Sequence, residues 1–386
     1  MTRATLFFLS TAAASLILFY CVWGGVGPEL PLPVPLGEHE NVTEGEDHRN
    51  TTDIVLKAND THLTKRTTKL LIGVGCQKCG TTSLFAYLRT LKWATTAEGR
   101  FAKELHFFDH KLQGHVEAGT ERTILDRYLS YWPEQTYNSS PSQHVLVEIT
   151  PDYMFNPDTP WVMHQVFAKS DVLPHVMLII MLRNPIQRAY SGYFHGKKGT
   201  SDQFKEITKH SLDVLQDCGH NMEQQLQQTE HSGLCMTKGQ TSNLGACSWQ
   251  HCHTATLCHH LKYPHYLSRG QYLDQIQNML CAGFQPQQMM FFTFHELVEN
   301  QLDVLQRVSE FVGRPFQFTS NKGPAKVLNG VKLTSKAKGE MDEESIAMLQ
   351  EFYREETKLL VQFLEQGGFL VDMAALRKEM AGLLEG

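Results

Sequence analysis

The sequence predicts a three-layer α/β fold with a central, mainly parallel β-sheet, preceded by an N-terminal transmembrane helix. Short, continuously apolar runs alternate with stretches of helical spacing, which is typical of buried parallel strands covered by helices. The first of these runs ends in a glycine-rich loop that leads into a helix, which makes the predicted fold P-loop-like. A charge-free apolar stretch at residues 4–26 predicts the membrane helix.

Residues 4–26 are long and apolar enough to cross a bilayer as a helix. Arg3 is the only charge before them, so the positive-inside rule predicts a cytoplasmic tail of residues 1–3 and a lumenal remainder. A cleaved signal peptide is the alternative, because the small residues 12–15 offer a cleavage site. We expect a single-pass type II membrane protein.

Residues 27–65 predict an extended lumenal stem. Four prolines lie at its start, and the stretch that follows is polar with almost no apolar periodicity. N-glycosylation acceptor patterns support a secretory-pathway location and predict a glycoprotein. The acceptor asparagines are Asn41, Asn50 and Asn59 in the stem, and Asn138 further along the chain.

The composition of the 386-residue chain excludes some classes of protein. It carries 35 Lys or Arg against 41 Asp or Glu, a net charge of −6, which excludes a strongly basic nucleic-acid binder. Its 41% of hydrophobic residues suffice for a sizeable core. We expect one large folded domain at residues 66–386, interrupted at residues 196–262 by an insertion rich in Gln, His and Cys.

The expected elements of this domain follow from the apolar patterns. Continuous apolar runs predict buried strands at residues 69–75, 144–149, 176–182 and 289–294. Helical spacing predicts helices at residues 81–90, 186–195, 272–280, 302–312 and 343–364. In such a fold ligands bind at the carboxyl ends of the strands.

The cysteines have two alternative uses. Eight of the nine lie beyond the membrane helix, and an even lumenal number favours disulfides. The cysteines and histidines at residues 247–260 alternatively bind zinc, although their spacing matches no compact zinc module. Cys76 and Cys79 form a C-x-x-C pair, but the glycines around them favour a different use over redox chemistry.

Residues 75–82 form a predicted phosphate-binding loop between the first strand and its helix. Glycines let the backbone approach an anion, the helix N-terminus adds partial positive charge, and a lysine adds a full charge. In the Walker pattern the lysine directly follows the second glycine, whereas in this chain it precedes the second glycine by two positions. The predicted binding residues are Lys78, Cys79, Gly80, Thr81 and Thr82.

Two further segments carry polar residues near predicted strand ends. Arg183 follows the third strand and Ser191 lies two turns into the next helix, so the two side chains are predicted to converge on a second phosphate. The 103–109 segment places an acid, an imidazole and another acid among aromatic residues.

Together these segments resemble the Golgi membrane-bound sulfotransferases that modify heparan sulfate, chondroitin and related glycosaminoglycans. The resemblance covers residues 70–364 apart from the insertion. It implies that the phosphate-binding loop holds the 5′-phosphosulfate of 3′-phosphoadenosine 5′-phosphosulfate (PAPS), and that Arg183 and Ser191 hold its 3′-phosphate. It also implies that a loop containing Lys336, Lys338 and Gly339 closes over the nucleotide.

The resemblance further implies an in-line sulfuryl transfer to a glycan hydroxyl or amine, with no metal. Glu104 is the expected general base, and we expect its aromatic neighbours to raise its pKa. Lys78 is expected to stabilise the leaving group. His106 is a second candidate base or an acceptor contact, oriented by Asp109, which is also a candidate acceptor contact. His195 matches a substrate-binding histidine of the N-sulfotransferase branch, or is a helix-surface residue.

One departure leaves the acceptor open. Members of the family often have a lysine where this chain has Ile149, and the Cys-rich insertion is closer in character to the chondroitin-type relatives. Neither the heparan nor the chondroitin branch is favoured. A lumenal P-loop kinase and a catalytically silent glycan-binding relative are the alternative functions.

Overall fold

The computed structural model describes residues 68–99, 102–112, 116–133, 144–195, 200–228, 265–320 and 339–385. The predicted membrane helix, stem, glycosylation sites, residues 247–260, Lys336 and Lys338 lie outside these ranges. Within the described ranges, no helix combines the length and hydropathy required to span a bilayer.

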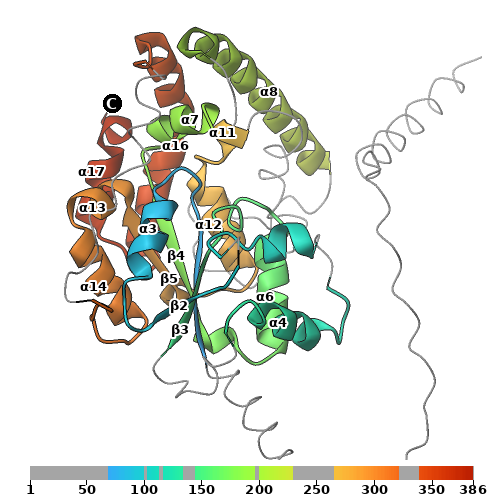
Figure 1. The fold of residues 1–386 in the computed structure, drawn as a ribbon. Coiled ribbons are helices and arrows are strands. Elements are labelled where there is room, and N and C mark those ends of the chain that lie inside the picture. The colour runs from blue at the N-terminus through green and yellow to red at the C-terminus, as the bar shows by residue number, and fades with distance from the viewer. Residues whose placement is uncertain are drawn as a thin grey trace, which may run out of the picture. The chain divides into compact units, whose positions relative to one another are not determined.

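The core of the fold is a five-stranded sheet in the order β2-β3-β1-β4-β5, and every pair of neighbouring strands is parallel (Figure 1). The predicted parallel sheet is therefore confirmed. The strands are β1 (Lys69–Gly75), β2 (Ala94–Thr96), β3 (Val145–Ile149), β4 (Val176–Leu182) and β5 (Met289–Thr293).

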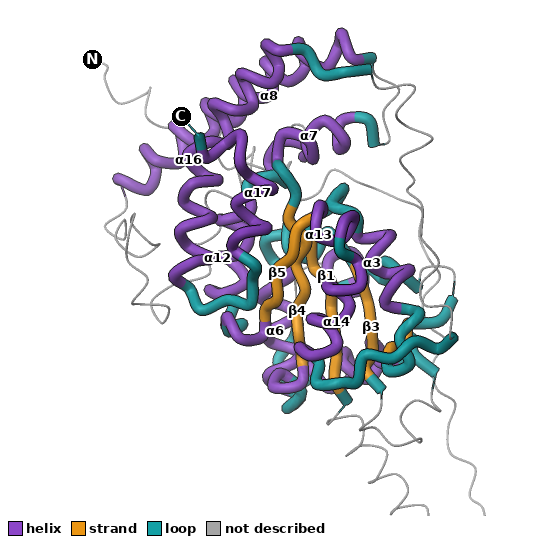
Figure 2. Tube along the Cα trace, turned by 90° about the vertical axis from the view of Figure 1, so that its left-hand side faces the viewer, coloured by secondary structure: helices purple, strands orange, loops and turns teal. Residues whose placement is uncertain are grey.

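Helices cover both faces of the sheet, which gives the three expected layers. Figures 1 and 2 show α3, α13 and α14 on one face, with α6 and α12 on the other. The helices and helical turns are α3 (Thr81–Leu88), η1 (Phe107–Lys111), α4 (Glu121–Leu129), α6 (Thr159–Lys169), η2 (Leu173–His175), α7 (Pro185–Tyr193), α8 (Ser201–Gln228), α11 (His265–Ser268), α12 (Tyr272–Cys281), η3 (Pro286–Gln288), α13 (Phe294–Glu299), α14 (Gln301–Phe311), α16 (Glu343–Gln366) and α17 (Met373–Leu384).

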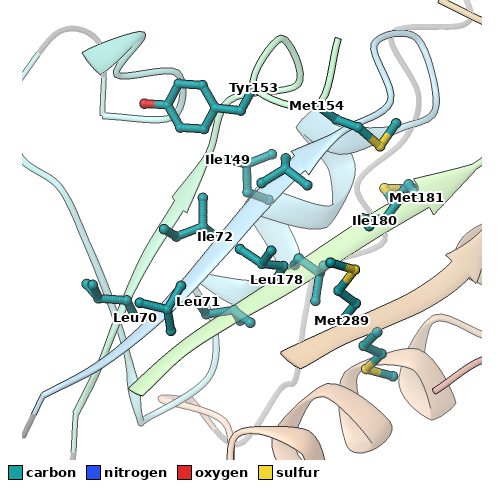
Figure 3. Packing of buried hydrophobic residues seen from close by; sticks show 14 of the residues in the cluster. Leu70, Leu71, Ile72, Ile149, Tyr153, Met154, Leu178, Ile180, Met181 and Met289 are labelled. Carbon is teal, nitrogen blue, oxygen red and sulfur yellow. The ribbon is translucent and has the colours of Figure 1, made fainter. Parts of the chain in front are cut away.

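The position of β1 in the sheet places the phosphate-binding loop at the middle of the carboxyl edge. β1 pairs with β3 on one side and β4 on the other, and its apolar side chains are almost completely buried. Ile72 pairs with Leu178 of β4, while Ile149 of β3 packs against Gly73 on the other face of the sheet (Figure 3). Burial on both faces explains why this strand reads as a continuous apolar run.

A second buried cluster lies beyond the carboxyl ends of the strands. Ile186 and Tyr193 of α7, Phe204 of α8, Leu267 of α11 and Tyr353 of α16 pack together there. The cluster fixes α7 beside the end of β4. The predicted insertion thus begins with an ordered helix, since α8 contributes to this cluster.

Candidate active site

The phosphate-binding loop turns sharply between β1 and α3. Lys78 and Gly80 both adopt positive φ, 71° and 94°. A Cβ atom at Gly80 would lie 3.1 Å from the Phe294 ring and 3.2 Å from the Met181 side chain, so glycine suits both the backbone and the packing. No side chain caps the N-terminus of α3, which leaves its positive end for an anion.

The two cysteines of the loop are joined to each other. Cys76 and Cys79 form a disulfide, and both are buried. The Tyr272 hydroxyl lies 3.5 Å from the Cys76 sulfur and donates a hydrogen bond of 2.8 Å to the Arg183 carbonyl. Since the Cys79 side chain is buried, only its main chain can meet a phosphate. The disulfide agrees with the expectation that the cysteines form disulfides. Tyr272 contacts both the loop and the residue that follows β4.

Two arginines hold the loop from the β4–α7 side. Arg183 Nη1 donates to the Lys78 carbonyl at 2.9 Å, and its guanidinium lies 4.4 Å from the centroid of the Phe294 ring. Arg188 is completely buried and donates to the carbonyls of Gln77, at 3.4 Å, and Tyr266. Arg183, predicted to bind the second phosphate together with Ser191, therefore lies beside the phosphate-binding loop.

These cations have no ion-pair partner within the described residues, although the carboxylates of Glu104 and Glu379 act on Lys78 and Arg183 over a longer distance. None of Lys78, Arg183 and Arg188 forms an ion pair there, and the Nε atoms of both arginines are buried without a hydrogen-bond partner. Burial, followed by repulsion from Arg183 and Arg188, lowers the pKa of Lys78. Uncompensated positive charge around a loop of this shape favours binding of a polyanion.

His195 lies next to the loop lysine. The Lys78 Nζ and His195 Nδ1 atoms are 3.3 Å apart. Burial and the nearby Lys78 charge lower the pKa of His195 below its ordinary value. His195 is accordingly neutral near pH 7, and Nδ1 accepts a hydrogen bond from the Lys78 ammonium group. His195, expected either to bind substrate or to be a helix-surface residue, thus lies beside the phosphate-binding loop.

The pKa prediction for Glu104 is wrong. His106 and the paired Lys103 lower the pKa of Glu104 to about 2, instead of apolar neighbours raising it. The Glu104 Oε2 and His106 Nε2 atoms are 3.8 Å apart, and the glutamate side chain is 40% exposed. Its apolar neighbours Leu105 and Phe107 are buried in the core instead. Glu104 is consequently a permanent carboxylate.

His106 is a cation, so it does not serve as a second base at neutral pH. Its Nδ1 atom lies 2.8 Å from Asp109 Oδ2, and hydrogen bonding to Asp109 and Glu104 raises the pKa of His106 to about 10. The orienting role predicted for Asp109 is confirmed by this contact. Direct contact of Asp109 with an acceptor is not supported, because its side chain is only 1% exposed.

The residues predicted to bind the second phosphate, Arg183 and Ser191, lie just before α7 and within it. Asn184 caps this helix by accepting hydrogen bonds from the Ile186 and Gln187 N–H groups. Ser191 lies further along α7 and is half-buried. Its neighbour Tyr190 donates a 3.4 Å hydrogen bond to the carbonyl of Gly339, the one predicted closing-loop residue that the structure describes.

Comparison with known proteins identifies the family. A family model described as the sulfotransferase domain matches residues 68–361. The chain belongs to the sulfotransferase domain family. It is 24% identical over 319 residues to the bifunctional heparan sulfate N-deacetylase/N-sulfotransferase 1 of Caenorhabditis elegans. That match covers 78% of this sulfotransferase but only 30% of the relative.

Solved structures of sulfotransferases also match. The sulfotransferase of Alicyclobacillus acidocaldarius aligns with a TM-score of 0.45 and 20% identity, over 80% of this chain and 98% of that one. The sulfotransferase domain from the curacin biosynthetic pathway aligns with a TM-score of 0.35 and 12% identity, over 74% and 98%.

Several residues that build this sulfotransferase site were given no role from the sequence, although they surround Ile149, the position at which relatives often carry a lysine. Glu148 is completely buried and accepts hydrogen bonds from Tyr153 at 2.7 Å, from Thr150 at 2.8 Å and from Tyr128. Tyr153 in turn accepts from the Phe107 N–H at 3.0 Å, which fixes the 103–109 segment. Burial raises the pKa of Glu148. The alternation of the strand turns Ile149 to the opposite, apolar face, against β1.

Proposed function

We propose that this sulfotransferase transfers a sulfuryl group from PAPS to a hydroxyl or amine of a glycosaminoglycan or related glycan. The observation that carries the proposal is the unpaired cationic group of Lys78, Arg183 and Arg188 around the phosphate-binding loop, with the carboxylate of Glu104 next to it. Members of the sulfotransferase family generally use PAPS, whose two phosphate-bearing ends suit two groups of cationic and polar residues.

The arrangement supports an in-line transfer with divided roles. The phosphate-binding loop would hold the 5′-phosphosulfate, while Arg183 and Ser191 would hold the 3′-phosphate. Lys78, whose Nζ atom lies 3.3 Å from His195 Nδ1, would neutralise the charge that grows on the leaving phosphate oxygen. The transfer step breaks the sulfur–oxygen bond to this phosphate and forms a sulfur–oxygen or sulfur–nitrogen bond to the acceptor.

Glu104 would take the acceptor proton despite its low pKa. As the new bond to sulfur forms, the acceptor atom becomes positively charged and its proton far more acidic, so a weak but fully ionised carboxylate suffices. The imidazolium of His106, held by Asp109, would orient Glu104. None of these steps needs a metal ion.

We also propose a glycan acceptor and a Golgi location. The C. elegans relative is named as a heparan sulfate N-sulfotransferase, which supports an acceptor of this class. The predicted type II anchor at residues 4–26 and the acceptor asparagines would place the catalytic domain in the Golgi lumen.

The test is to incubate the full chain with labelled PAPS and a panel of desulfated heparan, chondroitin and dermatan chains. We expect label in at least one glycan, and the labelled position identifies the branch. A lack of label in every glycan would contradict the glycan assignment. Turnover of ATP with magnesium, and none of PAPS, would support the kinase alternative instead.

The pH dependence of the reaction should report on His195. Neither Glu104, with a pKa of about 2, nor His106, with a pKa of about 10, titrates between about pH 5 and 8. The charges that face His195 are Lys78 and Arg269, which lower its pKa, and Glu104 and Asp152, which raise it. Below this pKa a protonated His195 would repel the Lys78 ammonium group, so kcat/KM should fall as the pH falls.

Measuring pH profiles of wild type and His195→Asn checks this expectation. The asparagine cannot be protonated, so we expect the acid limb to disappear in the variant. His175→Asn is the matched control, because His175 lies in η2 before β4 and should keep the wild-type profile. An acid limb of equal position and slope in His195→Asn would exclude His195 as its source.

A further inference from the structure

His106, from the proposed catalytic segment, and His110, directly after that segment, form a stacked pair. Their ring centroids are 4.5 Å apart and their planes differ by 8°. The two residues are four positions apart across η1, and this spacing places two side chains on one side of a helical turn. Two histidines at this spacing supply the metal ligands in H-E-x-x-H zinc sites.

Two aspartates complete a compact group with these histidines. Asp109 Oδ2 lies 2.8 Å from His106 Nδ1 and 3.7 Å from His110 Nε2. Asp152 approaches from the turn after β3, and one ligand atom from each of the four residues lies within 4.8 Å of the others. Rotation of the two imidazole rings out of their stacked, nearly parallel arrangement would let all four atoms face one ion.

One carboxylate oxygen of Asp109 lacks a hydrogen-bond partner within the described residues. Its Oδ1 atom is buried and has no hydrogen-bond partner within the described residues, and its side chain is 1% exposed. A buried carboxylate oxygen without a partner is costly, and a cation held by both carboxylate oxygens of Asp109 would remove the cost. The protein contacts His106–Asp109 and Arg269–Asp152 leave this oxygen unsatisfied.

We propose that His106, Asp109, His110 and Asp152 form a binding site for a divalent transition-metal ion, with zinc the best match. Two imidazole nitrogens and two carboxylate oxygens suit zinc better than calcium or magnesium, which prefer oxygen ligands alone. The site shares His106 and Asp109 with the proposed catalytic segment, and a bound ion would replace the proton that His106 carries in the metal-free protein, so metal binding is tested by itself and not through turnover.

The surroundings suit such a site. Arg269 Nη1 and Gln77 Nε2 contact Asp152 Oδ1 at 2.5 and 3.5 Å, which orients that carboxylate as outer-shell partners do in metal sites. His110 is 64% exposed and offers a path for the ion from solvent. Asp109, at the other side of the group, is closed to solvent.

Calorimetric titration of the full chain with zinc tests the proposal directly. We expect His110→Ala to bind one equivalent fewer than wild type, while His210→Ala, a control on α8, keeps the wild-type stoichiometry. Because His110 is exposed, its removal should leave folding intact, which a thermal melt checks. Equal zinc stoichiometry and affinity in His110→Ala and wild type would overturn the proposal.

Cobalt substitution separates this site from the cysteines and histidines of residues 247–260. Cobalt bound by nitrogen and oxygen gives visible d–d bands without the near-ultraviolet charge-transfer band of a thiolate site. We expect Asp152→Asn to weaken cobalt binding at the thiolate-free site by about 10-fold or more. Unchanged cobalt affinity and spectrum in Asp152→Asn would remove Asp152 from the ligand set and contradict the site as proposed.

Discussion

Replacing Lys78 with alanine should lower kcat for sulfuryl transfer by about 10²- to 10³-fold. The lysine is the only side-chain cation contributed by the phosphate-binding loop itself, and its ammonium group is aimed by the hydrogen bond to His195. Stabilisation of the leaving oxygen grows as the bond to sulfur breaks, so the loss should appear mainly in kcat. Steady-state rates with labelled PAPS measure it.

The matched control for Lys78→Ala is Lys92→Ala. Lys92 is exposed and lies after α3, so its removal should leave kcat within about twofold of wild type. Calorimetric binding of the spent nucleotide distinguishes a lost contact from a collapsed loop. If Lys78→Ala turned over at the wild-type rate, the phosphate-binding loop would not supply the leaving-group cation.

Replacing Glu104 with glutamine should lower kcat by about 10²- to 10⁴-fold while the spent nucleotide still binds. The amide has nearly the shape of the carboxylate, and the contact between His106 and Asp109 remains, so the segment should keep its position. Because the pKa of Glu104 is about 2, wild type is already ionised at any assay pH. Raising the pH should therefore not restore the variant.

Two measurements make the Glu104 prediction specific. Glu98→Gln changes an exposed carboxylate just after β2 and should leave kcat and nucleotide affinity unchanged. A nucleotide affinity in Glu104→Gln that matches wild type assigns the loss to the chemical step. Robust transfer by Glu104→Gln would instead exclude this residue as the base.

The strands of the sheet were predictable because burial on both faces leaves a continuous apolar run. β1 and β4 begin and end where that pattern predicts. β2 was missed, because its three residues are half-buried and too few to show any periodicity. α17 was also missed, because its burial depends on packing against α16 and β5, which its own sequence does not show.

The site was predictable only where its chemistry is local in the sequence. The phosphate-binding loop and Arg183 stand directly after strands, so parallel packing brings them to one edge. Arg188 and Tyr272 were missed because each contacts a backbone atom more than 75 positions away. The predicted direction of the Glu104 pKa shift was wrong. Phe107 and Phe108 are close to Glu104 in the sequence, but their side chains lie in the core and do not surround its carboxylate.

Glu379 links the last described helix to the carboxyl edge of the sheet. Its buried carboxylate accepts hydrogen bonds from the Asn184 N–H at 2.8 Å and from the His295 N–H and Nδ1 at 3.1 and 2.6 Å. α17 lies beyond residue 361, where the family match ends. During synthesis, the turn after β4 thus emerges from the ribosome long before the carboxylate that secures it. The hydrogen bonds from the Asn184 and His295 N–H groups to this carboxylate can therefore form only after residue 379 has emerged.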